Sequence, residues 1–300
     1  MRCLIVGCGY VGLPLGTELV RLGHEVFGLR RSAAPELNAA GIRPLLADIT
    51  RPETLAALPR EFDWVVHCVA AGGDADNYRR VYRQGTREVL RWLAPSPPKK
   101  FVYTSSTSVY GQTDGSQVKE SSPAEPLAET ARVLVETEKI LLDAFQQQRF
   151  PAVILRVAGI YGPDRGHWFK RFLRNEARME GDGARFLNMI HRDDVVGCIL
   201  AALKNGRAGE IYNAVDDEPV SQANFFLWLA ATVGKYPPAS APQNPDEDRK
   251  RGVTNKRVLN RRLKMELGCQ FKYPNFRQGY SAEILRLERA GELHIAPDER

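Results

Sequence analysis

Three glycines near the start of the chain have the spacing of a dinucleotide-binding turn. Gly7, Gly9 and Gly12 form a GxGxxG pattern that includes Tyr10 and Val11. An apolar segment typical of a buried strand precedes the pattern, and a segment with helical periodicity follows it. Glycines at these places permit a tight turn and let the backbone approach a pyrophosphate at the helix N-terminus. We therefore predict a dinucleotide site on these five residues; the alternative is a tight turn without a ligand.

The charges after the second expected strand indicate which dinucleotide binds. NAD-binding folds usually place an acid there for the ribose hydroxyls, whereas this chain has Arg30, Arg31 and Ser32. Two guanidinium groups and a hydroxyl suit a 2′-phosphate. We therefore predict that NADP(H) is preferred over NAD(H), with a solvated turn as the alternative. Asp48, after the third expected strand, either accepts a hydrogen bond from the adenine amino group or caps the next helix.

The elements that must position these residues alternate between short apolar runs and helical patterns. This alternation predicts an α/β fold: a Rossmann, doubly wound parallel sheet with helices on both faces. We expect strands at residues 3–7, 25–30, 43–49, 63–70, 100–106 and 151–162, and helices at 9–23, 78–93 and from 128 onward.

The alternation loosens after residue 162. A strand is expected at 209–215, and a Pro- and charge-rich loop at 235–252. We expect an NAD(P)-binding domain over residues 1–162. Residues 163–300 should form a small C-terminal substrate-facing lobe, interleaved with the sheet by the strand at 209–215.

Composition narrows the class of protein. The chain has 300 residues, 43% of them hydrophobic and 26% charged, as in globular proteins. It has no apolar run long enough for a membrane span and no leader, and its five cysteines form no CxxC pair, so we expect a cytoplasmic protein with reduced thiols. The net charge of +6 is scattered and not interleaved with aromatic residues, so we expect no nucleic-acid partner. No residues have metal-ligand spacing, so no metal is expected.

Longer motifs resemble those of the extended short-chain dehydrogenase/reductases, a family that includes sugar-nucleotide epimerases and dehydratases. The resemblance depends on four segments: "TSSTSVYG" (104–111), "LRVAGIYGP" (155–163), "NMIHRDDVVGCILAAL" (188–203) and "GEIYNAVDDEPVS" (209–221). Within the family the chain is most similar to the atypical, YeeZ-like members. Residues 255–280 of this chain also resemble the tail of those proteins. The resemblance implies a nicotinamide cofactor and a homodimer that buries the helices at 78–93 and from 128 onward.

The resemblance supplies a catalytic serine but not the usual acid and base. Ser106 matches the serine that polarises the substrate. In the family, a tyrosine on the following helix is the acid/base, and a lysine four residues later lowers its pKa. Alignment on "ETEKILL" puts Thr130 and Leu134 at these positions, and neither can do this chemistry. Tyr82 replaces the family's supporting asparagine, and we predict that it supplies the missing acid; the alternative is a tyrosine that packs on Tyr78.

Further residues are expected to line the site. We expect Ile49, Val69, Ala70, Thr104 and Ala158 beside the cofactor, and Thr107, Tyr161 and His191 beside the substrate. Basic residues between Arg165 and Arg185 suit a phosphate or carboxylate on a small substrate, or form a solvated helix face. A lone histidine more often caps or packs than binds a ligand, so this alternative stays open for His191.

Two classes of function follow from these residues. The first is an NADP(H)-dependent oxidoreductase or epimerase with a non-standard acid, because hydride transfer mainly needs a correctly held cofactor. The second is a non-catalytic NADP(H) sensor or partner-docking module. An open cleft at the nicotinamide end favours the enzyme, and a filled cleft favours the sensor. The glycine turn also resembles that of UDP-sugar 6-dehydrogenases, but no cysteine here has the glycine-rich setting of their nucleophile.

Overall fold

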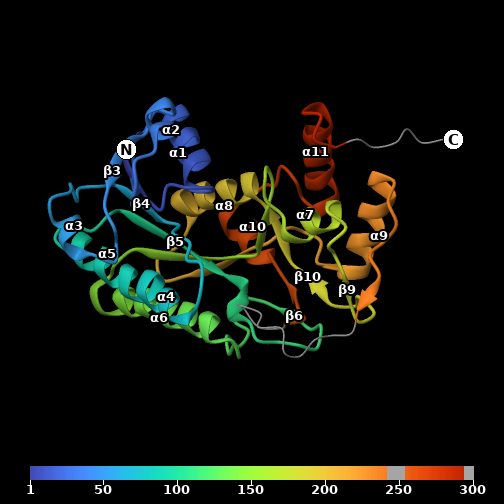
Figure 1. Cartoon of the computed structure of the whole chain (residues 1–300). Coiled ribbons are helices and arrows are strands. Elements are labelled where there is room, and N and C mark those ends of the chain that lie inside the picture. Colours follow the sequence, from blue (N-terminus) through green and yellow to red (C-terminus); the bar gives the residue numbers. More distant parts are fainter. Residues whose placement is uncertain (242–253, 294–300) are drawn as a thin grey trace.

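The computed structural model describes residues 1–241 and 254–293, and its centre is one seven-stranded parallel sheet (Figure 1). The strand order is β12-β7-β5-β4-β1-β2-β3. These strands are β1 (Arg2–Val6), β2 (Glu25–Arg30), β3 (Arg43–Leu46), β4 (Trp64–His67), β5 (Lys100–Ser106), β7 (Ala152–Val157) and β12 (Ile211–Ala214). The strand order reverses at β1, so the topological switch point lies between the neighbouring strands β1 and β4. The predicted Rossmann-like α/β fold is confirmed.

Helices cover both faces of this sheet (Figure 1). One face carries α1 (Gly12–Arg21), α2 (Pro35–Ala39) and α8 (Arg192–Asn205). The other carries α3 (Pro52–Ala56), α4 (Ala75–Tyr78), α5 (Gly85–Leu93) and α6 (Glu129–Gln148). Strands covered on both sides are mostly apolar: all six residues of β7 are buried, and all but Arg156 are apolar.

Several expected elements have different bounds in the structure. β3 and β4 end before the expected residues 49 and 70, because the chain turns into loops at the carboxyl edge of the sheet. The expected strand 151–162 divides at Ala158 into β7 and β8 (Gly159–Tyr161). The helix expected at 78–93 contains a π-helical turn over Arg79–Gln84. The Pro- and charge-rich loop expected at 235–252 lies outside the described residues from position 242 on.

A second, smaller core lies beside the sheet and is rich in aromatic residues. It contains residues of α7 (His167–Leu173), α9 (Gln222–Val233), α11 (Phe276–Arg289) and the short strands β10 (Phe186–Leu187), β11 (Met189–His191) and β13 (Val220–Ser221), together with Tyr161 of β8. Next to α9, β9 (Met179–Glu180) pairs with β14 (Ser240–Ala241). In contrast, β12, α8 and α10 (Arg261–Leu267) belong to the sheet's own core. The division into domains at residue 162 stays a prediction.

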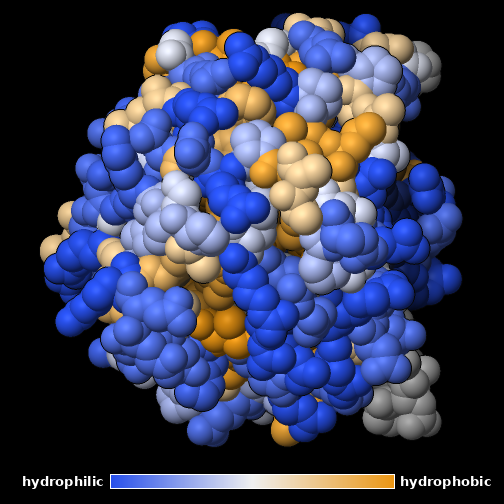
Figure 2. Space-filling view, turned by 90° about the vertical axis from the view of Figure 1, so that its left-hand side faces the viewer, coloured by the Kyte–Doolittle hydropathy of each residue, from blue (hydrophilic) through white to orange (hydrophobic). Residues whose placement is uncertain are grey.

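One side of the molecule is mainly hydrophilic. Figure 2 shows the side of the molecule near β3 and α3, where hydrophilic residues dominate and apolar residues show in smaller patches between them. Across residues 1–241 and 254–293, no helix combines the length and the apolar character of a membrane span.

A buried ion pair joins β7 to α6. The Arg156 guanidinium donates to both carboxylate oxygens of Glu138, with an Nη2–Oε2 distance of 2.7 Å, and these side chains are 5% and 3% exposed. Glu138 also accepts from the Ser105 hydroxyl at 2.6 Å, so the same carboxylate holds the end of β5. Burial would lower the pKa of Arg156, but the neighbouring carboxylate raises it above the usual range.

Removing one partner of this pair should strongly destabilise the protein, because the remaining charge stays buried. We expect Arg156→Met to lower the free energy of unfolding by about 3–5 kcal/mol. Urea unfolding followed by circular dichroism measures the change. Arg21→Met, which breaks the exposed Arg21–Glu18 pair, is the matched control and should leave stability nearly unchanged. Equal effects of the two substitutions would contradict this account.

Candidate cofactor and substrate site

A cavity of about 410 Å³ follows the carboxyl ends of β1, β2, β4, β5 and β7. This is the edge of a doubly wound sheet where ligands bind. It is lined by most residues expected beside the cofactor: Gly7, Gly9, Tyr10, Val11, Arg30, Arg31, Ser32, Asp48, Ile49, Val69, Ala70, Thr104 and Ala158. Gly12 does not line it. The structure therefore brings together nearly the whole expected set.

The three glycines of the turn lack a side chain for different structural reasons. Gly7 has a φ of +91°, and a Cβ there would lie 2.8 Å from backbone atoms of Val69. A Cβ on Gly12 would lie 2.8 Å from the Gly7 carbonyl oxygen, so Gly12 has a packing role. A Cβ on Gly9 would meet no atom within 4 Å. Because no atom of the described residues excludes a side chain at Gly9, the lack of a side chain there fits the close approach of a pyrophosphate.

The two arginines at the cationic end of the cavity differ in whether a carboxylate of the described residues already pairs with them. Arg30 Nη1 lies 2.5 Å from Glu36 Oε1, so its charge is already partly compensated. Arg31 and Ser32 are exposed and line the cavity. Asp48 Oδ1 accepts from the backbone N–H and the hydroxyl of Thr50, at 2.9 and 2.8 Å. Asp48 thus shapes the turn before α3 while it faces the cavity.

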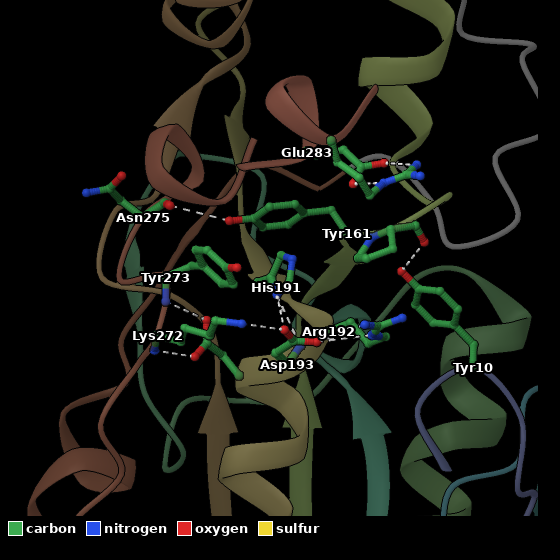
Figure 3. A network of polar contacts seen from close by, with 12 residues as sticks. Tyr10, Tyr161, His191, Arg192, Asp193, Lys272, Tyr273, Asn275 and Glu283 are labelled. Carbon is green, nitrogen blue, oxygen red and sulfur yellow. Dashed lines mark hydrogen bonds and ion pairs between the residues drawn. The ribbon is translucent and has the colours of Figure 1, made fainter. Parts of the chain in front are cut away.

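Tyr10 connects the glycine turn to the loop after β8 (Figure 3). Its hydroxyl donates to the Pro163 carbonyl oxygen at 2.9 Å. The guanidinium groups of Arg165 and Arg192 lie 5.0 and 5.3 Å from its ring centre. Burial raises the pKa of Tyr10 to about 12 although both cations lower it, so the phenol stays neutral. Arg165, one of the basic residues expected near the substrate, lines the same cavity as the glycine turn.

The other end of the cavity contains the residues considered for catalysis. Ser106, 8% exposed, lines it and accepts from the Ser108 N–H at 3.2 Å. Leu134, which we expect at the position of the family's lysine, is an apolar part of the wall, and Thr130 is buried near the start of α6. Tyr82 also lines this end, and its hydroxyl oxygen accepts from the Ala71 N–H at 3.1 Å.

Tyr82 reaches the cavity from the π-helical turn. Such turns widen a helix locally and often occur at functional sites. Its ring also packs on Tyr78, with ring centres 5.0 Å apart. Both readings of Tyr82 therefore stay open, because it lines the cavity and packs on its neighbour.

A second cavity of about 270 Å³ adjoins the first, and Ser106 and Ile160 line both. Thr107 and Tyr161 line it, as expected for residues beside a substrate. Tyr161 is stacked on Tyr280, with ring centres 4.3 Å apart, and forms a wall. Arg185 also lines this cavity. Lys256 lines this cavity as well, and the sequence did not predict it. Lys256 lies in a stretch of scattered basic residues that has no motif of its own.

His191 lies elsewhere than expected, inside a polar network at the start of α8 (Figure 3). Its Nδ1 accepts from the Asp193 N–H at 3.1 Å and caps the helix. Its ring lies 4.1 Å from that of Tyr273, and it lines neither cavity. Burial lowers the pKa of His191 to about 4, so the ring is neutral at pH 7. Substrate contact by His191 stays a prediction that this geometry does not favour.

The described residues include neither a reactive cysteine at the glycine turn nor a cluster of side chains that could hold a metal ion. All five cysteines are free thiols, and Cys8, beside the glycine turn, is buried. Burial raises the pKa of Cys8 to about 12, so it remains a thiol and a poor nucleophile. Residues 1–241 and 254–293 contain no group of three or more His, Cys, Asp or Glu side chains placed to hold a metal ion.

A Rossmann sheet with a glycine turn at its switch point defines a class of dinucleotide-binding proteins. Residues 3–214 match the NAD dependent epimerase/dehydratase family, and the chain belongs to this family. Protein YeeZ of Escherichia coli strain K12 is 29% identical over 91% of this chain and 97% of its own length.

Solved structures agree with this assignment. A Methylobacillus flagellatus protein, provisionally named an NAD-dependent epimerase/dehydratase, is 32% identical and has a TM-score of 0.78 over 96% of this chain and 98% of its own. The dTDP-glucose 4,6-dehydratase DesIV of Streptomyces venezuelae, solved with NAD and TYD bound, is 22% identical with a TM-score of 0.82 over 96% and 97% of the two chains. The second likeness shows the fold alone.

The buried, neutral His191 should make stability depend on pH. Its pKa is about 4 in the folded protein, against an ordinary value of 6.5, so its contribution is complete above pH 6.5 and is lost as the pH falls toward 4. We expect His191→Asn, which keeps a capping side chain, to reduce the slope of unfolding free energy between pH 6 and 5 by about 1.4 kcal/mol per unit. Urea unfolding at several pH values measures the slope; His67, also buried and neutral, adds to the dependence in both proteins. An unchanged slope would be the contrary result.

Proposed function

We propose that this protein is an NADP(H)-dependent oxidoreductase or epimerase that acts on a small molecule without the Tyr-Lys pair of its family. The observation that carries the proposal is the pair of adjoining cavities with Ser106 in the wall of both. A cofactor in the first cavity and a substrate in the second would meet at this hydroxyl. The space beyond Ser106 supports an enzyme over a sensor, whose nicotinamide end we expect to be filled.

The residues of the first cavity fit a dinucleotide. The open space at Gly9 would take the pyrophosphate, with Arg165 beside it, and the exposed Arg31 and Ser32 would take the 2′-phosphate. Arg30 would contribute only if its bond to Glu36 were exchanged, so we assign the preference for NADP(H) chiefly to Arg31. When bound, the nicotinamide supplies or accepts the hydride.

The remaining chemistry belongs to the chain's own side chains. Ser106 would donate its hydroxyl hydrogen to a substrate carbonyl oxygen and polarise it. Leu134 would pack against the cofactor where the family's lysine binds the ribose. Tyr82 is our candidate for the proton donor, because its phenol lines the same end of the cavity.

A cofactor-binding module without catalysis is the alternative. Thr130 and Leu134 favour it, because neither can transfer a proton at the usual position. The homodimer through α5 and α6, implied by the family, is compatible with either function and stays a prediction.

Arg31 provides the test of cofactor preference. We expect Arg31→Ala to weaken NADPH binding by about tenfold, through loss of a charge-assisted hydrogen bond, while NADH binding hardly changes. Fluorescence titration with each reduced cofactor measures both affinities. Equal affinity of the unaltered protein for NADH and NADPH would refute the preference.

Gly9→Val is the control for dinucleotide binding itself. Its side chain would occupy the open space, so both cofactors should lose affinity while urea unfolding stays unchanged. Unaltered cofactor binding would place the dinucleotide elsewhere.

Ser106→Ala and Tyr82→Phe test the catalytic roles. With a panel of small aldehydes and ketones, the rate of NADPH oxidation should fall by about 100-fold or more for each variant, because a polarising or acid group is lost. Tyr78→Phe, its packing neighbour, is the matched control and should retain turnover. Normal turnover by Tyr82→Phe would remove the assigned acid, and no turnover of any substrate by the unaltered protein would favour the sensor.

A further inference from the structure

Lys256 is a buried cation in the wall of the second cavity. The residue is 4% exposed. Its ammonium donates to the Tyr110 carbonyl oxygen and to the Thr254 hydroxyl, both at 2.8 Å. Both acceptors are neutral, and an ammonium has three N–H donors. Among residues 1–241 and 254–293, the hydrogen-bond partners of Lys256 therefore leave its charge unneutralised and one of its N–H donors unused.

A second cation lies nearby. Arg185 lines the same cavity, and its Nε lies 3.3 Å from Glu180 Oε2. The positive charge of Arg185 is close enough to Lys256 to lower the pKa of the lysine. Lys256 is buried, whereas Arg185 is half-buried and already paired with Glu180. The two positive charges repel each other, and an anion bound between them would relieve that repulsion.

Neutral donors on the 3₁₀ turn Thr107–Val109 complete the wall. Ser108 is 9% exposed and lines the cavity, and its hydroxyl has no hydrogen-bond partner within the described part of the chain. A buried hydroxyl of this kind is unusual, because such groups are normally satisfied. It is a group that an oxygen-rich ligand would satisfy.

The segment that carries Lys256 is held firmly in place. The Asn188 side chain donates to the Lys256 carbonyl oxygen at 2.9 Å and accepts from the Val258 N–H at 2.8 Å. The next residues form β15 (Arg257–Val258), which pairs with β6 (Gln117–Val118). The ammonium therefore projects from a fixed backbone, which suits a preorganised binding group.

We propose that Lys256 and Arg185 bind an oxyanion of the substrate, a carboxylate or a phosphate, so that a neighbouring carbon faces Ser106. The location of the reacting carbon depends on the proposed function, whereas the anion site itself does not need the cofactor. The substrate class is therefore a small acid or phosphate ester, and Lys256 is a specificity-determining residue.

The charge of Lys256 makes this site pH-dependent. Burial, and secondarily the charge of Arg185, lower its pKa from 10.5 to about 8. Below this pH the ammonium is charged and attracts an anion, so affinity should fall as the pH rises through about 8. The other titratable groups around the cavity are His167, Tyr161 and Tyr280, and Glu180 pairs with Arg185. Burial raises the pKa of both tyrosines well above this window.

The experiment is a titration of the full chain, without cofactor, with inorganic phosphate and separately with acetate. Tryptophan fluorescence reports binding, since Trp168 lines the cavity, and Trp168→Phe should abolish the signal. We expect Lys256→Met to lower affinity for the bound anion by about tenfold or more, and Lys256→Arg to restore most of it. Lys139→Met removes the same charge from the exposed face of α6 and should change nothing.

The outcomes separate the possibilities. Saturable phosphate binding alone would indicate a phosphate ester as substrate, and acetate binding alone a carboxylic acid. Absence of saturable binding of either anion, or unchanged affinity in Lys256→Met, would overturn the proposal. If Lys256→Met unfolds, Ser108→Ala should still weaken anion binding, and its failure to do so would count equally against the site. NADPH titration of the same protein tests the proposed function separately.

Discussion

The Arg156–Glu138 ion pair holds together the elements that form the site. Arg156 lies next to the last residue of β7, and Glu138 lies on α6. The Glu138 carboxylate also binds Ser105, one residue before Ser106. This fixes how far along the sheet α6 lies, and therefore where Leu134 meets the cavity. Since both charges are buried, the helix cannot slide without separating them, which is costly.

The same pair connects the sheet to the second cavity. The Arg156 guanidinium lies 4.8 Å from the ring centre of Tyr110, whose hydroxyl donates to Asn213 on β12 at 2.8 Å. The Tyr110 carbonyl oxygen in turn accepts from Lys256. The two cavities are thus linked by hydrogen bonds and packed side chains, so a substrate in one can be held in a fixed relation to a ligand in the other.

The fold and the cofactor side of the site could be predicted from sequence because their signals are local. The GxGxxG turn, the strand ends and the alternation of strands and helices each involve residues close in the chain. Gly7 and Arg31 line the same cavity because parallel strands end at one edge of the sheet.

The substrate side depends on contacts between distant segments, which periodicity does not report. Lys256 reaches its place through pairing of β15 with β6, about 140 residues earlier in the chain. His191 had two possible roles in the sequence, ligand contact or helix capping, and the structure shows its ring capping the start of α8. Arg165 was one of the basic residues expected near the substrate, and the sharp loop after β8 turns it toward Tyr10.

If the usual Tyr-Lys pair is replaced as we propose, the chain must supply its chemistry from other side chains. The cofactor would carry the hydride, and a hydroxyl, a phenol and a buried ammonium would share the orientation and proton transfer otherwise assigned to one helix. This division of roles is the central claim, and it depends on where the nicotinamide lies relative to Ser106.

A crystal structure of the NADPH complex would test that claim most directly. We expect the nicotinamide to lie between Leu134 and Ser106, with the Ser106 hydroxyl within roughly 3–3.5 Å of the position of a reacting oxygen and the second cavity open beyond it. A nicotinamide displaced from Ser106, or enclosed by side chains that leave no room for a substrate, would contradict the account.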